Sequence, residues 1–213
     1  MDRFKSAFRS AASKLAFAAT NTMQDMARGG LPQEPEVTAA LVVRFKDALN
    51  GHTKSGITWS AKILSSHGPK TEEKEFGADF LGVLRLELEG CSIIKGFLAQ
   101  AKRQEPGRAL STVDWDRLKK QCEKMLSFSA ESFVFVYSLN GVFMIPAIGV
   151  SACSNSEDLH TLHPKTTSQF YKEHFQCFIG ERRIDQTSHR VLEDLRYRHG
   201  LEIRADVETA VLG

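Results

Sequence analysis

The sequence has no long hydrophobic run and no dense cysteine pattern. Nowhere in its 213 residues is there a stretch approaching the roughly 18 consecutive apolar residues that a membrane-spanning helix needs, so we expect no membrane partner. The four cysteines contain no CxxC pair, and a chain of this length is expected to fold without a disulfide framework. A reducing cytoplasm is the expected compartment.

A strong charge of one sign is also missing, as are internal repeats and low-complexity segments. Lys and Arg number 28 against 26 Asp and Glu, which leaves a formal net charge of +2. This balance permits a nucleic-acid partner without requiring one, because local patches matter more than the total charge. With 42% hydrophobic residues the chain can bury the core of one α/β domain with modest additions.

Residues 1–30 are predicted to form an amphipathic helix. The segment is rich in Ala, Ser, Lys and Arg, with Phe4, Phe8, Leu15 and Phe17 among them. We favour a helix that packs on its own domain or on a second subunit over a membrane anchor or a transit peptide. A homo-oligomer or a partner protein could therefore be contacted through this segment.

A second helix is predicted from Glu34 to about Leu49. Pro35 occupies a tolerated first-turn position, and the carboxylates of Glu34 and Glu36 lie near the positive end of the helix. Glu34 is in line with an inward stripe at i+4, i+7 and i+11, formed by Thr38, Leu41 and Phe45.

Extended segments follow at residues 57–64, 77–88 and 95–102, with a turn at 88–90. Asp79 belongs to the second predicted strand. Gln100 and Lys102 belong to the third, and they share one face because strand side chains alternate.

A helix then begins near Ser111, with apolar residues at helical spacing up to Leu126. Two strands at 133–137 and 142–146 flank an Asn140-Gly141 turn, which completes the order helix, three strands, helix, strand. The remaining residues, 151–213, are expected to hold a polar loop and two or three helices, including one near 185–199.

Asp79, Gln100 and Lys102 together supply the groups that phosphodiester hydrolysis requires. A divalent cation held by oxygen ligands can generate the nucleophile and offset developing negative charge. A lysine adds a compact positive charge for the phosphate or the attacking water.

Gly77-Ala78-Asp79-Phe80 and, twenty residues later, Gln100-Ala101-Lys102 resemble the PD-(D/E)xK signature of restriction-endonuclease-like nucleases. The order of elements over residues 31–150 matches that superfamily's α-β-β-β-α-β core. The resemblance implies a mixed central sheet flanked by helices, with residues 1–30 as an added helix and 151–213 as a helical extension packed on the core.

The resemblance also implies an activity and a set of roles. The expected activity is a Mg²⁺-dependent deoxyribonuclease, more specifically an endonuclease, with Mn²⁺ as a substitute metal and DNA as the substrate. Asp79 would be the principal metal ligand, Gln100 the second ligand and Lys102 the catalytic lysine. Members of the superfamily often belong to restriction or anti-phage defence systems.

Further positions fit the same family. Members often carry a glutamate in the first helix that completes the metal site; Glu34 is the first candidate here and Glu36 the second. Gln121 is similar to a glutamine that exonuclease and RecB-type members carry after the lysine, although their following tyrosine is not evident. A catalytic site built from Asp79, Gln100, Lys102, Glu34 and Gln121 is the result.

Gln100 departs from the commonest pattern, which has Asp or Glu at that position. A glutamine carbonyl can ligate a cation but adds no negative charge. Some active branches use this QxK variant. The alternative is a catalytically inactive protein on the same fold that binds nucleic acid or serves as an assembly subunit.

Two further clusters are candidates for binding. Lys95, Arg103 and Arg108 could form a basic rim for a nucleic-acid backbone, continued by lysines of the next helix; the alternative is a solvated surface. His160-x-x-His163 and His174-x-x-Cys177 have zinc-ligand types, although histidines in polar loops are more often only solvated. DNA against RNA, and endonuclease against exonuclease, stay open at this point.

Overall fold

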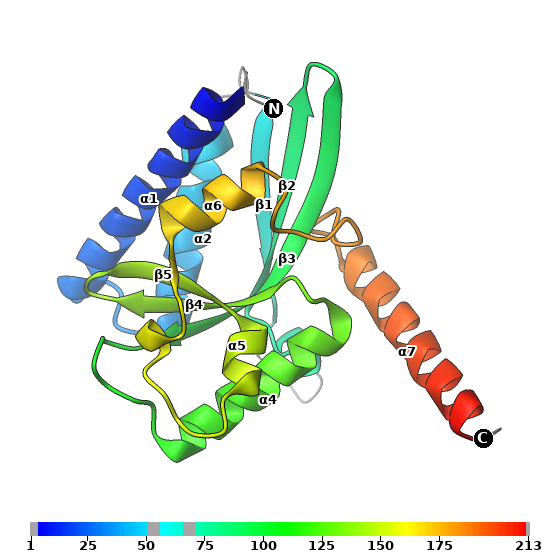
Figure 1. Ribbon diagram of the computed structural model, residues 1–213. Coiled ribbons are helices and arrows are strands. Elements are labelled where there is room, and N and C mark those ends of the chain that lie inside the picture. Colours follow the sequence, from blue (N-terminus) through cyan, green and yellow to red (C-terminus); the bar gives the residue numbers. More distant parts are fainter. Residues whose placement is uncertain (1–3, 51–55, 66–70, 212–213) are drawn as a thin grey trace.

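The computed structural model describes residues 4–50, 56–65 and 71–211, without the side chains of Asn50, Cys91 and residues 201–211. Its centre is a six-stranded mixed sheet in the order β1-β2-β3-β4-β5-β6 (Figure 1). The β3–β4 pair is parallel and the other neighbours are antiparallel. The strands are β1 Ile57–Ile63, β2 Phe80–Leu88, β3 Cys91–Arg103, β4 Ser132–Ser138, β5 Gly141–Pro146 and β6 Lys165–Thr166.

Helices cover both faces of this sheet, and each layer has its own apolar core. One layer consists of α1 Lys5–Ala27, α2 Glu34–Asn50 and α6 Thr167–Phe175. The other consists of α3 Glu72–Phe76, α4 Thr112–Phe128, α5 Ala147–Ala152, the 3₁₀ turn Leu159–Thr161 and α7 His189–Val211. The chain is therefore an α/β protein with a mixed sheet between two layers of helices.

The predicted order of helix, three strands, helix and strand is confirmed, but the second strand begins later than expected. It starts at Phe80 because residues 72–76 form the short helix α3, which Gly77 ends in a left-handed conformation with φ of 70°. The third strand is longer than predicted and begins directly after the turn at residues 89–90. The predicted helix start at Ser111 is confirmed, since its hydroxyl accepts from Asp114 N.

The first helix packs on its own domain. One stripe of α1, including Phe8, Leu15 and Met23, is buried against α2 and α6. Phe17 lies outside this stripe and is 67% exposed, because a spacing of two residues turns a side chain to the other side of a helix. No helix in the described part of the chain combines the length and the apolar character needed to cross a bilayer.

Residues 151–213 add two principal helices. Helix α6 places Phe170 and Tyr171 in the same core as α1, and α7 begins with Val191, Leu192 and Leu195 buried against the opposite layer. The short helix α5 and the two-residue strand β6 are additions that the sequence pattern does not indicate.

The packing of α1 gives a direct stability test. We expect Leu15→Ala to lower the free energy of unfolding by about 2–5 kcal/mol, because Leu15 is fully buried and its removal leaves a cavity. Phe17→Ala on the same helix should change it by less than about 0.5 kcal/mol. Chemical denaturation of both variants measures the difference, and equal losses would contradict this orientation of α1.

Candidate active site

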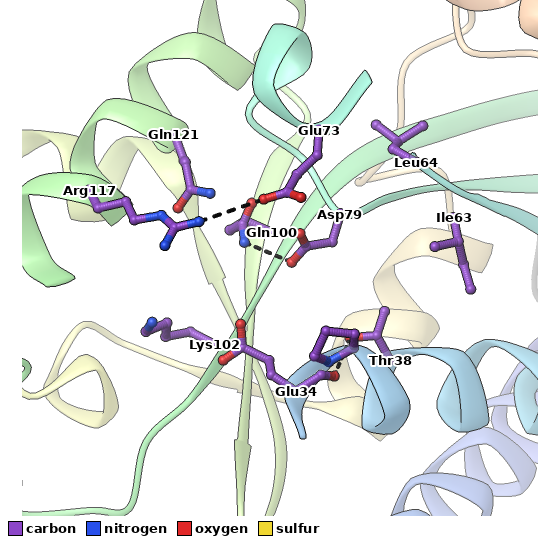
Figure 2. A pocket seen from close by; sticks show the side chains of 11 residues that line it. Glu34, Thr38, Ile63, Leu64, Glu73, Asp79, Gln100, Lys102, Arg117 and Gln121 are labelled. Carbon is purple, nitrogen blue, oxygen red and sulfur yellow. Dashed lines mark hydrogen bonds and ion pairs between the residues drawn. The ribbon is translucent and has the colours of Figure 1, made fainter. Parts of the chain in front are cut away.

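A pocket of about 250 Å³ opens where α2, α3 and α4 meet the ends of β1, β2 and β3 (Figure 2). All five residues that the sequence singles out for catalysis line it: Glu34, Asp79, Gln100, Lys102 and Gln121. They come from four different elements or their flanks, so only the tertiary structure brings them together.

Asp79 is held in the pocket by β3. The residue lies directly before β2, and its backbone bonds to both neighbouring strands, from its own N to Ala99 O (2.8 Å) and from Leu64 N to its own O (2.7 Å). Its Oδ2 accepts from Ala101 N at 2.7 Å and from Gln100 Nε2 at 2.7 Å. The carboxylate therefore has a defined orientation.

Gln100 leaves one polar atom in the pocket without a partner. Its side chain is 4% exposed, and its Nε2 donates to Asp79 and, at 3.2 Å, to Ala101 O. Within the described residues its Oε1 is buried and accepts no hydrogen bond. A buried, unpartnered carbonyl oxygen is costly unless a ligand completes it.

Glu34 enters from the first turn of α2. Its Oε2 accepts from Arg103 N at 2.6 Å, directly beyond Lys102 on β3. One turn further on, Thr38 Oγ1 donates to Glu34 O and hydrogen bonds to the buried hydroxyl of Tyr137, both at 3.0 Å. This contact fastens the start of α2 to β4 and so positions Glu34.

Glu36, the second helix candidate, is placed elsewhere. It is exposed, and its Oε2 accepts from Gln33 N at 3.0 Å, so it caps the start of α2. The geometry selects Glu34 over Glu36 as the carboxylate of α2 that faces the pocket.

Lys102 shares the pocket face of β3 with Gln100, as strand alternation predicts. Figure 2 shows its side chain extending toward the side of the pocket where Arg117 lies. Among the residues that the structure describes, no carboxylate lies within ion-pair distance of its ammonium group. The group is therefore available to a ligand in the pocket.

The sequence patterns do not indicate two of the residues that line the pocket, Glu73 on α3 and Arg117 on α4. Glu73 Oε1 lies 3.9 Å from Arg117 Nη2, and the Glu73 side chain is 17% exposed. A helix-start signal was present, because Thr71 precedes three glutamates in four residues and its side chain accepts from Lys74 N.

The other two glutamates of α3 point away from the pocket and fasten the helix. Glu72 pairs with Lys62 and accepts from Ser65 N at 3.1 Å. Glu75 forms a two-bond contact with Arg196 of α7, one bond of which is 2.6 Å. Glu73 is therefore the carboxylate of α3 that this anchoring turns toward Asp79 (Figure 2).

Gly77 allows α3 and α4 to approach closely. Its φ of 70° ends α3, and a Cβ at this position would lie 2.4 Å from the backbone oxygen of Gln121. Only glycine satisfies both requirements. Two residues later the chain reaches Asp79, so this contact sets the spacing between Asp79 and Gln121.

Negative charge accumulates in a poorly solvated place. Burial is the largest cause that raises the pKa of Asp79 to about 7; nearby Glu73 and Glu34 add to the rise, and the bonds from Ala101 and Gln100 oppose it. Burial also raises the pKa of Glu34, against the attraction of Lys102. A bound cation would lower the pKa of both carboxyl groups.

The donor set fits a hard divalent cation. Among the described residues, no group of three or more His, Cys, Asp and Glu side chains is arranged to hold a metal. The side-chain amide of Gln100 adds an oxygen to this set, because its Nε2 donates to Asp79 while its Oε1 is buried without a partner among the described residues. Hard cations such as Mg²⁺ take such oxygens and keep several waters, so few protein ligands suffice.

The predicted basic rim is wrong at Lys95. Lys95 lies five positions before Gln100 on β3, and this odd offset places the two side chains on opposite faces of the sheet. Lys95 is 3% exposed and its ammonium donates to Ile179 O, which excludes contact with a nucleic-acid backbone at the pocket. Arg103 and Arg108 are exposed and stay candidates.

The zinc hypothesis is also wrong in this structure. His174 is completely buried, with Nδ1 bonded to Ile179 O at 2.9 Å, whereas His160 Nε2 bonds to Gln104 O at 3.0 Å. These residues lie in different cores, and the described residues hold no histidine–cysteine metal group.

No protein-family model matches the chain, and no curated protein matches it.

Removing the Asp79 charge should stabilise the metal-free protein at neutral pH. Because its pKa is raised from 3.8 to about 7, the folded state binds more protons than the unfolded chain between these values. The free energy of unfolding therefore falls as pH rises through this window. Asp79→Asn keeps a side-chain oxygen that can accept from Ala101 N, and it removes the charge whose burial causes this fall in the free energy of unfolding.

We expect Asp79→Asn to melt higher than the wild type in EDTA at pH 8 and to differ little at pH 4. Each kcal/mol corresponds to about 2–4 °C for a chain of this size. The exposed Asp47→Asn is the matched control and should leave the melting temperature unchanged at both values. A gain for Asp79→Asn that does not depend on pH would contradict the burial of this charge.

Proposed function

We propose that the chain is a metal-dependent nuclease with a restriction-endonuclease-like core that hydrolyses phosphodiester bonds of DNA. One observation carries the proposal: Asp79, Gln100, Lys102 and Glu34 meet in one pocket, and the Gln100 carbonyl oxygen there has no partner within the described residues. The order α2, β1, β2, β3, α4, β4 supports the same assignment, because it is the order of that superfamily's core.

Asp79 and Gln100 would hold the cation, with Glu34 or Glu73 as the further carboxylate. When bound, a divalent cation supplies a Lewis acid that activates water and stabilises charge on the phosphate. The backbone N–H of Ala101 keeps Asp79 oriented, which reduces the reorganisation needed when the cation binds. The Arg103 N–H does the same for Glu34.

Lys102 would act on the substrate directly. Its ammonium lines the pocket without a carboxylate partner in the described part of the chain, so it can donate to a non-bridging phosphate oxygen or orient the attacking water. Gln121, on the facing wall, would support the water or the phosphate by a hydrogen bond.

Cleavage of plasmid DNA in Mg²⁺ or Mn²⁺ tests the proposal. We expect Asp79→Asn and Lys102→Ala each to lower the cleavage rate by about 100-fold or more, because the first removes the charged ligand of the cation and the second removes a positive charge that would face the phosphate. The matched controls Asp47→Asn and Lys46→Ala, both exposed on α2, should cleave as the wild type does. RNA of the same length is offered in parallel.

Different outcomes have different meanings. A wild-type protein that binds DNA yet leaves DNA and RNA intact in every metal would overturn the enzyme and favour the non-catalytic nucleic-acid-binding alternative. Full cleavage by Lys102→Ala would show that the chemistry lies elsewhere in the molecule.

The identity of residue 100 should set the metal requirement. Gln100→Glu adds a carboxylate oxygen beside Asp79, and we expect the Mg²⁺ concentration for half-maximal cleavage to fall by about tenfold. Without metal the same variant should melt lower than the wild type, because two like charges then adjoin.

Gln121→Glu is the matched control, since it adds the same charge to the same pocket from α4. An equal shift in the Mg²⁺ requirement for both variants would mean that only the charge matters and that residue 100 is not a ligand.

A further inference from the structure

A second groove opens directly onto the site pocket, between α3 and α4. It encloses about 700 Å³, and Glu73, Arg117 and Gln121 line both the groove and the pocket. Lys120 and Lys124 of α4 line the groove but not the pocket. A chain-like ligand with one unit in the pocket could therefore continue into the groove.

Cations predominate along this groove. Its lining includes four basic side chains, Lys74, Arg117, Lys120 and Lys124, and two acidic ones, Glu73 and Asp116. Glu73 faces the pocket and already lies 3.9 Å from Arg117. The groove lining therefore carries a net positive charge, in contrast to the acidic interior of the pocket.

The basic residues of α4 follow one line along the helix. Arg117, Lys120 and Lys124 are spaced by three and four residues, so they share a face, and all three are exposed. The opposite side of α4 is buried through Trp115 and Met125. At 1.5 Å per residue the line extends about 10 Å along the helix.

Two of these basic side chains contact other residues of the protein, Lys124 by a hydrogen bond and Arg117 by an ion pair. Lys124 Nζ donates to Lys74 O at 2.8 Å, which leaves further N–H donors of the ammonium for a ligand. Among the residues that the structure describes, Arg117 has one ion-pair partner, Glu73 at 3.9 Å, and its side chain is 72% exposed. A phosphate bound by the Arg117 guanidinium could replace its contact with Glu73, and the Glu73 carboxylate would then be available to a ligand in the pocket.

We propose that the α3–α4 groove binds the sugar–phosphate backbone of a DNA strand next to the phosphate that lies in the pocket. Arg117 contacts the first phosphate outside the pocket, and Lys120 and Lys124 contact those beyond it. The groove reads no bases, so it contributes affinity and direction of the strand. This inference rests on the proposed nuclease function.

The salt dependence of DNA binding tests the groove. A fluorescent duplex of random sequence is titrated with Asp79→Asn protein, which keeps the DNA intact, over a range of NaCl concentrations. We expect Lys120→Ala with Lys124→Ala to reduce the slope of log K against log salt by about 2 and to weaken binding about tenfold at moderate salt. Arginine at both positions should retain the slope.

The matched control removes two exposed lysines elsewhere, Lys46 on α2 and Lys172 on α6. An unchanged slope in the Lys120→Ala, Lys124→Ala variant, or the same reduction in the control, would overturn the proposal that the groove binds DNA and would leave the nuclease proposal intact. Failure of every protein to bind DNA would overturn both. Preferred binding of an RNA duplex with the same loss of slope would replace DNA as the occupant.

In the cleavage assay, the groove variant should have a KM raised about tenfold and a kcat within about twofold of the wild type. A loss in kcat alone, with an unchanged KM, would show that these lysines support the pocket rather than the strand.

Discussion

The carboxylate of Asp79 is held by two donors of the neighbouring strand, Ala101 N and Gln100 Nε2. This pair of bonds holds an acidic group at the poorly solvated start of β2, with Glu34 and Glu73 on the walls around it. The cost is visible in the pKa of Asp79, which burial raises to about 7. Fold stability, pH dependence and the proposed metal chemistry therefore depend on one buried carboxyl group that has no ion-pair partner among the described residues.

The helices on either side position the other carboxylates through contacts made by neighbouring side chains. Helix α2 is fastened to β4 by the hydrogen bond between Thr38, one turn after Glu34, and the hydroxyl of Tyr137. Helix α3 is fastened through Glu72 and Glu75, and this leaves Glu73 to face inward. Such supports explain how groups that repel one another are kept in a small pocket: each helix is held by bonds that other side chains make to neighbouring elements.

Charge changes sign over a short distance at this site. The pocket interior is acidic and suits a cation, whereas the adjoining α3–α4 groove carries four basic side chains and suits an anionic polymer. Arg117 lies at the boundary, beside Glu73. A substrate made of linked phosphates would satisfy both regions at once, with one phosphate near the cation and its neighbours on α4.

The sequence by itself determined the elements whose patterns are local and long. Helices α2 and α4, strands β1 to β5 and the shared face of Gln100 and Lys102 follow from periodicity, caps and strand alternation. Only the tertiary structure decided which side chains meet. Helix α3 is too short for a periodic signal, so no pattern placed Glu73 in the pocket. Arg117 belongs to the predicted helix α4, but its place in the pocket depends on how α4 packs beside α3. Lys95 donates to Ile179 O, some 80 residues away, and His174 packs on Phe97 of β3. No local pattern encodes the burial of these two residues, because it depends on segments distant in sequence.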